Sequence, residues 1–165
     1  MSGGINKTVL EIVNDIQYSD CDIKILSDAL KKCPNNVNEK NYFGHTALMS
    51  AVVKGRSDIV DLLLQCESID VNTQNKDKQT VLMYSAIFNR TKVCLKLLQF
   101  DTIDLELKHH SGRTALMWAF SYGHVYIIKI LLRHGAKYKG WENWEIDSNK
   151  KQQIYEIMEK KQINK

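Results

Sequence analysis

The sequence predicts an all-α solenoid built from helix-turn-helix units with projecting loops. The main observation is a six-residue pattern that recurs every 34 residues, as GHTALM at 44–49, KQTVLM at 78–83 and GRTALM at 112–117. A period of this length is typical of stacked units of two short helices and a connector, because one unit cannot bury its apolar face alone. The chain also has one proline and eight glycines among 165 residues, which favours helices with few interruptions.

The first helix of a unit is defined best by residues 44–55. A helix that begins near Thr46 brings small and branched apolar side chains to one face at the spacing i, i+3, i+4, namely Leu48, Ala51 and Val52. Gly55 then ends the helix, since glycine readily adopts the left-handed backbone of a helix terminus.

The second helix of the same unit follows directly. Ser57 or Asp58 can cap its first turn, and its apolar stripe consists of Ile59, Val60, Leu63 and Leu64. The polar segment 72–79 then returns the chain to the next unit. It is predicted to project from the stack, so its side chains are available to a partner.

One domain is predicted over residues 1–165. Its three clear repeats span 41–74, 75–108 and 109–139, between a degenerate N-terminal capping unit at 1–40 and a C-terminal helical cap at 140–165. The terminal units are expected to differ from the others, because one face of each meets water. The second apolar stripe of the first unit is formed by Ile23, Ile25, Leu26, Ala29 and Leu30.

The repeated pattern resembles that of the ankyrin-repeat family. The family's T-P-L-H-x-A element is similar to TALMSA at 46–51, TVLMYS at 80–85 and TALMWA at 114–119. Its D-x-x-G loop tip is similar to residues 41–44, 75–78 and 109–112. The resemblance covers about residues 41–139. It implies an ankyrin-type solenoid that binds a protein partner through a concave groove and its loop tips.

Two departures from the family pattern affect the loops. Methionine replaces the family's histidine at Met49, Met83 and Met117. Apolar packing must therefore substitute for the hydrogen bonds that this histidine makes between neighbouring loops in the family. Lys78 and Asn89 replace glycines of the pattern, so the loop of the middle unit is the one whose geometry the pattern determines least.

Composition and charge exclude several classes of protein. The 23 Lys and Arg residues and the 19 Asp and Glu residues give a net charge of +4, which is too balanced for the basic field that nucleic-acid binding usually needs. No apolar segment approaches the ~20 residues that cross a bilayer, and the N-terminus lacks the pattern of a secretory signal. We therefore predict no nucleic-acid partner and no membrane association.

The sequence also lacks the patterns of a metal site or an active site. Its four cysteines, Cys21, Cys33, Cys66 and Cys94, form no CxxC pair and have no histidine at zinc-finger spacing, so they are expected to be reduced thiols of a cytoplasmic or nuclear protein. No Gly-rich phosphate loop, GxSxG or HExxH is present. His109 and His110 adjoin Asp104 and Glu106, but neighbouring side chains on an extended tip point to opposite sides, which favours an exposed polar loop. We predict no enzyme activity, no metal and no cofactor.

Two pairs of aromatic residues are the most informative feature of the sequence for partner binding. Tyr84 and Phe88 lie at i, i+4 on the first helix of their unit, and Trp118 and Tyr122 occupy the same positions one unit later. Each pair therefore shares a helix face, and we expect the pairs to lie side by side towards the groove, as anchors for a partner. The alternative is that they complete the core. Both interpretations stay open for Tyr84 and Trp118, whereas partner contact is favoured for Phe88 and Tyr122.

The three loop tips carry the remaining candidate partner-binding residues, which are Tyr42, Phe43 and His45 on the first tip, Lys76, Asp77 and Gln79 on the second, and His110 and Arg113 on the third. Together these features predict an adaptor, inhibitor or assembly factor for one protein partner, and a monomer when unbound. The alternative is a structural scaffold or a self-associating, homo-oligomeric unit.

Overall fold

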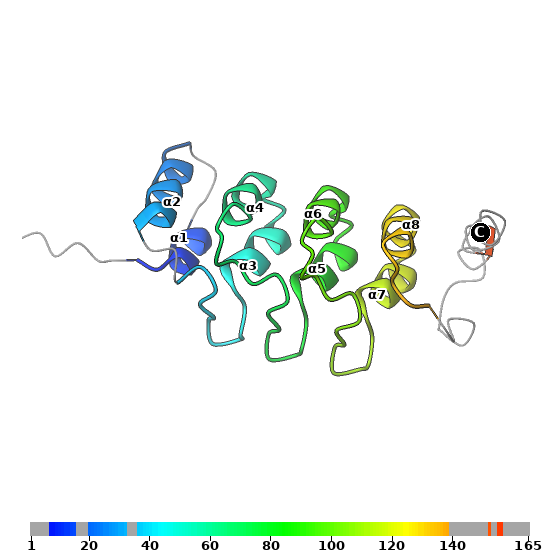
Figure 1. Cartoon of the computed structure of the whole chain (residues 1–165). Helices are drawn as coiled ribbons and strands as arrows, with labels where there is room; N and C mark the ends of the chain where they lie inside the picture. Colours follow the sequence, from blue (N-terminus) through cyan, green and yellow to red (C-terminus); the bar gives the residue numbers. More distant parts are fainter. Residues whose placement is uncertain (1–6, 16–19, 33–35, 139–151, 153–154, 157–165) are drawn as a thin grey trace, which may run out of the picture. The chain divides into compact units, whose positions relative to one another are not determined.

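The computed structural model describes residues 7–15, 20–32, 36–138, 152 and 155–156. This described part forms eight α-helices and no strand, which confirms the predicted all-α class. The chain divides into two compact units, Met1–Val81 (unit 1) and Leu82–Lys165 (unit 2). Within each unit the first helices of successive pairs lie in one row and the second helices in another (Figure 1). The predicted C-terminal cap lies almost wholly outside the described residues, and the other predicted boundaries stay predictions.

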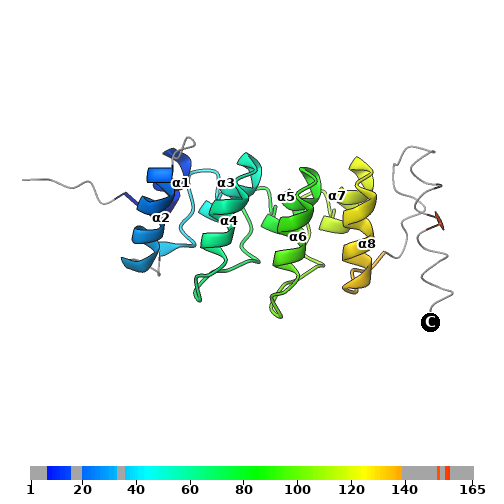
Figure 2. The same cartoon turned by 90° about the horizontal axis from the view of Figure 1, so that it is seen from above.

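Unit 1 contains two helix pairs, α1 (Val9–Asp15) with α2 (Asp20–Lys32) and α3 (Ala47–Lys54) with α4 (Ser57–Leu63). The first helices α1 and α3 pack together, and so do the second helices α2 and α4 (Figure 2). The apolar side chains that fill this core include Val9, Val13, Leu26, Leu48, Val52, Ile59, Val60 and Leu63. The degenerate N-terminal unit is thus a helix pair that packs on the pair after it.

One residue of the predicted stripe in α2 does not contribute to this core. Leu26 is fully buried, whereas Ile25 is exposed. Successive residues of a helix are separated by about 100°, and the buried stripe is centred on Leu26, with Ile23 and Leu30 three and four residues away. Ile25 therefore flanks the stripe and is turned towards solvent.

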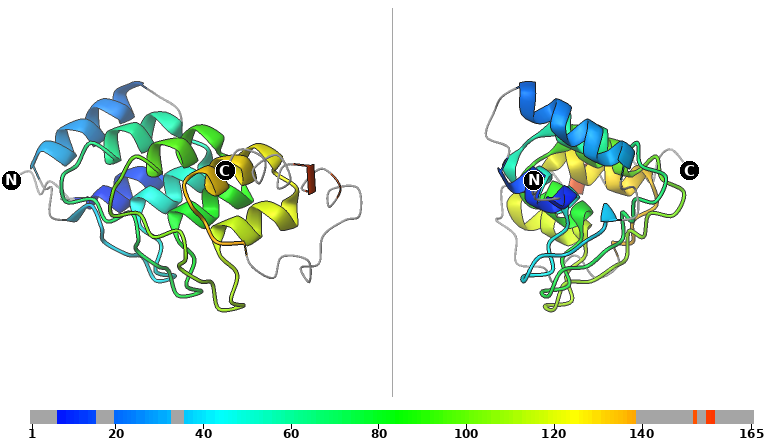
Figure 3. Two further views of the ribbon diagram at one scale, coloured as in Figure 1. Left: turned by 45° about the vertical axis from the view of Figure 1, so that its right-hand side comes forward. Right: turned by 90° about the vertical axis from the view of Figure 1, so that its left-hand side faces the viewer.

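Unit 2 also contains two helix pairs, α5 (Val81–Ile87) with α6 (Thr91–Leu97) and α7 (Ala115–Tyr122) with α8 (Val125–Arg133). Helix α8 packs on α7 and on α6. The buried side chains of these helices include Leu82, Ala86, Val93, Cys94, Leu97, Leu116, Ala119, Phe120, Ile127, Ile128 and Leu131. In each unit the connector between helix pairs extends away from the helices on one side (Figure 3), and so presents its tip to solvent.

The helix ends follow the prediction in part. Thr46 is the N-cap of α3, where its hydroxyl accepts a hydrogen bond from the Met49 amide at 3.3 Å. Gly55 ends the helix with φ of 73°, as predicted. The predicted capping of α4 by Ser57 or Asp58 is wrong, because the N-cap is Arg56 and it makes no side-chain capping bond. The Asp58 carboxylate binds the Arg56 guanidinium instead.

The left-handed turns recur even where glycine is absent. At the loop tips φ is 79° for Gly44, 61° for Lys78 and 78° for Gly112. After the first helices α3, α5 and α7 it is 73° for Gly55, 54° for Asn89 and 71° for Gly123. The middle loop therefore keeps the geometry of its neighbours, although a side chain makes this conformation costly. We conclude that the surrounding packing, and not the residue type, imposes the turn.

Replacing Lys78 with glycine is expected to stabilise the protein. Lys78→Gly removes the clash of Cβ in the left-handed region, which outweighs the extra freedom of glycine in the unfolded chain and raises the free energy of unfolding by about 0.5–1 kcal/mol. Asn89→Gly should give a smaller gain, since asparagine tolerates this conformation better. Equilibrium urea denaturation measures both. Lys108→Gly, at a loop lysine whose φ is negative, is the matched control and should give no gain. A loss of stability in Lys78→Gly would contradict the argument.

Candidate functional site

The first residue of each loop tip builds the turn that follows it. We call residues 41–45, 75–79 and 109–113 tip 1, tip 2 and tip 3. The Asn41 side-chain oxygen accepts hydrogen bonds from the amides of Phe43 and His45 at 2.9 and 3.0 Å. The Asn75 side-chain oxygen does the same for Asp77 and Gln79 at 3.0 and 2.7 Å. The sequence argument missed this role, although asparagine at the start of a tip is a known signal for such turns.

Tip 3 reaches a similar turn with a different side chain. The Ser111 amide donates to Nδ1 of His109 at 3.0 Å, and the backbone of His109 and Arg113 closes the loop with an N–H to carbonyl bond of 2.9 Å. His109 therefore has a structural role in its own tip.

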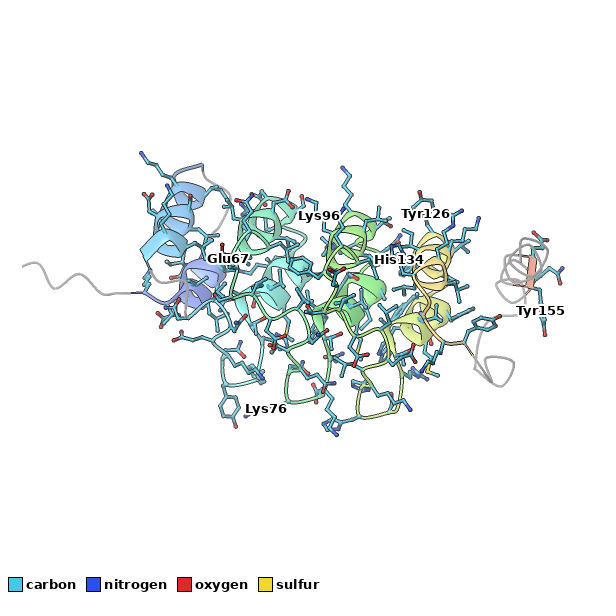
Figure 4. All side chains as sticks on the ribbon, in the orientation of Figure 1. Glu67, Lys76, Lys96, Tyr126, His134 and Tyr155 are labelled. Carbon is cyan, nitrogen blue, oxygen red and sulfur yellow. The ribbon has the colours of Figure 1, made fainter. Side chains whose placement is uncertain are left out.

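In unit 1, tips 1 and 2 touch and form one exposed cluster. The Lys76 amide donates to the Phe43 carbonyl at 3.1 Å, and Nζ of Lys76 lies 3.9 Å from the centre of the Tyr42 ring. The Tyr42 and Phe43 rings meet edge to face at 5.4 Å, and the Tyr42 side chain is 80% exposed. Figure 4 shows Lys76 at the outer end of its loop. We call Tyr42, Phe43 and Lys76 the tip cluster.

Two other candidates on these tips, His45 and Gln79, are less accessible. Gln79 accepts a hydrogen bond from the Asn75 amide group at 3.1 Å, so part of its side chain belongs to the turn. His45 is half-buried, and burial lowers the pKa of its imidazole from the ordinary value of 6.5, while the charge of Asp77 acts in the opposite direction. Asp77 is exposed at the end of tip 2.

In unit 2, each aromatic pair consists of an inner and an outer ring. Tyr84 is 7% exposed, and its ring stacks on Phe88 at 6.2 Å between centroids, with Phe88 41% exposed. Trp118 is half-buried and stacks on Tyr122, also at 6.2 Å, with Tyr122 47% exposed. Tyr84 therefore belongs to the core, Trp118 is only partly covered, and a partner would mainly meet the outer rings.

Tip 3 lies against the second of these pairs. The His109 ring meets Trp118 edge on at 5.5 Å, and the Arg113 guanidinium carbon lies 4.9 Å above the same indole. Tyr122 in turn stacks on His124 at 5.9 Å. The structure thus joins Arg113, Trp118 and Tyr122 in one continuous surface. His124 was missed as a member of it, because nothing in its spacing marks it as more than a turn residue.

The described residues offer little reactive chemistry. His110 is exposed, whereas the neighbouring His109 ring turns onto Trp118, and the described residues contain no group of three or more potential metal ligands. Cys66 and Cys94 are free thiols. Burial raises the pKa of the Cys94 thiol to about 12 and also raises that of Cys66, which disfavours their reactive thiolate forms. Within the described residues, no helix has the length and apolar character of a membrane span.

A family model described as ankyrin repeats (3 copies) matches residues 6–75 and 67–140. None of the curated proteins matches the chain.

Gly44 and Gly112 have nearly the same φ, 79° and 78°. Comparing substitutions at these two positions therefore separates the effect of the turn from the effect of the contact between tips 1 and 2. A Cβ at Gly44 would lie 2.8 Å from the Lys76 nitrogen, whereas at Gly112 it would meet no described atom within 4 Å. Gly44→Ala should therefore lower the free energy of unfolding by about 1–3 kcal/mol more than Gly112→Ala. Faster hydrogen exchange of the Lys76 amide should accompany this loss. Equal losses in the two variants would show that the contact between the tips contributes nothing.

The burial of His45 predicts a pH dependence. Since its pKa is below 6.5 in the folded state, the unfolded chain binds more protons, and stability should fall as the pH is lowered through the range below 6.5. NMR titration should find this lowered pKa, and Asp77→Asn should lower it further by removing an attraction for the charged imidazole. His45→Gln should remove this part of the pH dependence in urea denaturation. Titration of His45 above 6.5 would be inconsistent with its burial.

Proposed function

The chain belongs to the ankyrin-repeat family, and on that premise we propose that it binds one protein partner as a non-enzymatic adaptor, inhibitor or assembly factor. Ankyrin repeats are generally protein–protein interaction modules. The proposed contacts are the groove-side face of α5 and α7 and the loop tips. No nucleic acid, membrane or cofactor takes part in this function, and the protein is monomeric when it is unbound.

One observation carries the proposal, namely the exposure of the outer rings of both aromatic pairs. Phe88 and Tyr122 lie at equivalent positions of consecutive repeats, and each stacks on an inner ring held in its helix. An aromatic side chain fixed in this way loses little conformational freedom when a partner covers it. Full burial of one such ring contributes about 2 kcal/mol. Two rings on one surface make a suitable centre for an interface.

The loop tips add polar contacts around this centre. Arg113 lies over the Trp118 indole, and His110 is exposed beside it on tip 3. In unit 1 the tip cluster offers two exposed rings and a lysine, and Asp77, His45 and Gln79 lie on the same two tips. The hydrogen bond between tips 1 and 2 supports recognition, because it holds these groups in place before a partner arrives.

The cysteines support two parts of this proposal, the cellular compartment and the absence of catalysis. We propose a cytoplasmic or nuclear location, where thiols such as those of Cys66 and Cys94 stay reduced. The raised pKa of Cys94 also makes it a poor nucleophile. These points agree with a binding protein and give no support to an enzyme.

The proposal predicts that removing the outer rings greatly weakens partner capture. In affinity capture from cell extract with mass spectrometry, Phe88→Ala combined with Tyr122→Ala should reduce recovery of the specific partner by about tenfold or more. Ile25→Ala, at an exposed apolar residue of α2, is the control and should capture as the unchanged protein does. Circular dichroism checks that both variants are folded.

Two outcomes would contradict the proposal. Unchanged capture by the folded double variant would remove the aromatic surface from the interface. Sedimentation that reveals a homo-oligomer, dissociated by the same double variant, would favour the self-associating alternative.

A further inference from the structure

A second surface of unit 2 is revealed by comparing the residue that precedes the second helix in each of three repeats. This residue is Arg56 before α4, Arg90 before α6 and His124 before α8. The backbone angles φ and ψ are −84° and 80° at Arg56, −86° and 65° at Arg90, and −82° and 71° at His124. The three side chains therefore leave the backbone in the same direction relative to their helices. Their contacts differ, since Arg56 binds the side chain two residues later, whereas His124 lies 3.2 Å from the Ile87 carbonyl oxygen and stacks on Tyr122.

At Arg56 the chain itself supplies an anion. Nε of Arg56 donates to one carboxylate oxygen of Asp58 at 3.0 Å, and Nη2 donates to the other at 2.6 Å. This two-point arrangement is the strongest way in which a guanidinium binds a carboxylate. The hydrogen bonds from Arg56 lower the pKa of Asp58, which keeps the carboxylate charged.

At Arg90 the same arrangement cannot form. The residue two positions later is Lys92, so a second cation stands where unit 1 has a carboxylate. Nε of Arg90 is buried, and among the described residues it has no hydrogen-bond partner. A buried donor without a partner costs free energy, and two neighbouring cations repel each other. Because the buried Nε is closed to outside groups, a carboxylate from a partner can approach only the rest of the Arg90 guanidinium, where it would offset the repulsion between Arg90 and Lys92.

The helices around Arg90 provide a surface of matching character. Every charged residue of α6 and α8 is basic, whereas both charged residues of α4 are acidic. Helices α6 and α8 pack side by side, and two large apolar side chains are exposed between the cations, Leu95 and Tyr126. Lys96 and Tyr126 lie on the side of unit 2 away from its loop (Figure 4). We call this surface the basic face, formed by Arg90, Lys92, Leu95, Lys96, Tyr126, Lys129 and Arg133.

We propose that the basic face binds an acidic, partly apolar segment of a partner protein, one carboxylate of which pairs with the guanidinium of Arg90. The carboxylate chemistry rests on the pair measured at Arg56. The apolar character of the proposed segment rests on the exposed side chains of Leu95 and Tyr126. A phosphate polymer has no apolar groups that could cover them. A nucleic acid also needs a longer track of cations than these two short helices supply. This site lies on the second helices and differs from the outer rings, of which Phe88 lies just past the end of α5, and not within the helix as predicted, and Tyr122 is the last residue of α7.

The decisive variant is Lys92→Asp. It restores within unit 2 the spacing of Arg56 and Asp58, so its carboxylate should bind Arg90 and compete with the external one. The probe is a fluorescein-labelled peptide that repeats the sequence EELE three times, and binding is measured by fluorescence anisotropy. Lys92→Asp should weaken binding by about tenfold or more and raise the midpoint of thermal unfolding, which separates loss of binding from loss of fold.

The controls separate this site from general charge effects and from the proposed function. Lys24→Asp makes the same change of charge at an exposed residue of α2 and should weaken binding less than about twofold, since exposed distant charges are screened. The Phe88→Ala and Tyr122→Ala double variant should bind the peptide as the unchanged protein does, because it leaves the basic face intact.

Four results would overturn the inference. These are no peptide binding by the unchanged protein, equal weakening by Lys92→Asp and Lys24→Asp, a lower unfolding midpoint for Lys92→Asp, and displacement of the peptide by equal concentrations of inorganic phosphate or oligouridylate. The last result would identify a general anion or RNA site instead of a site for an acidic protein segment.

Discussion

The left-handed residues that reverse the chain are the constraint on which the rest of this structure depends. One closes each loop tip, at Gly44, Lys78 and Gly112, and another follows each of the first helices α3, α5 and α7, at Gly55, Asn89 and Gly123. Lysine and asparagine accept this conformation at a cost in energy, so the packing of the helices on either side must impose it. Because these turns recur at the same places, every repeat presents its tip and its first helix in the same way.

The division of each aromatic pair into an inner and an outer ring follows from this arrangement. The inner residue lies nearer the start of its helix, where the helix packs into the unit, and the outer residue lies at or next to the helix end, near the left-handed turn. Stacking then couples the two rings, so the exposed ring rests on a rigid base. A surface of this kind combines apolar area with little conformational freedom, which is what a stable interface requires.

The repeats differ most where the backbone does not constrain the side chain. Arg56 and Arg90 have nearly the same backbone conformation, yet Arg56 binds the carboxylate two residues later and Arg90 has a lysine at that position of the sequence. Gly44 and Gly112 likewise share a value of φ, yet only Gly44 touches a neighbouring tip. The backbone conformation is therefore the same in both repeats, while the neighbouring groups differ.

The sequence by itself determined the repeat of 34 residues, the helix pairs, the positions of the turns and the resemblance to the ankyrin-repeat family. These features depend on backbone conformation and on contacts within one or two helical turns, which leave a periodic signal in the sequence. The same periodicity placed Phe88 and Tyr122 one repeat apart.

Only the tertiary structure decided which ring of each aromatic pair is buried and that Lys76 lies over Tyr42. It also decided that Asp58 binds Arg56 instead of capping α4, and that Nε of Arg90 is buried without a described partner. Burial of a ring and contact between tips depend on groups brought close by the packing of successive repeats. For Arg56 and Arg90, the choice between capping a helix and forming an ion pair depends on side-chain geometry that periodicity does not specify.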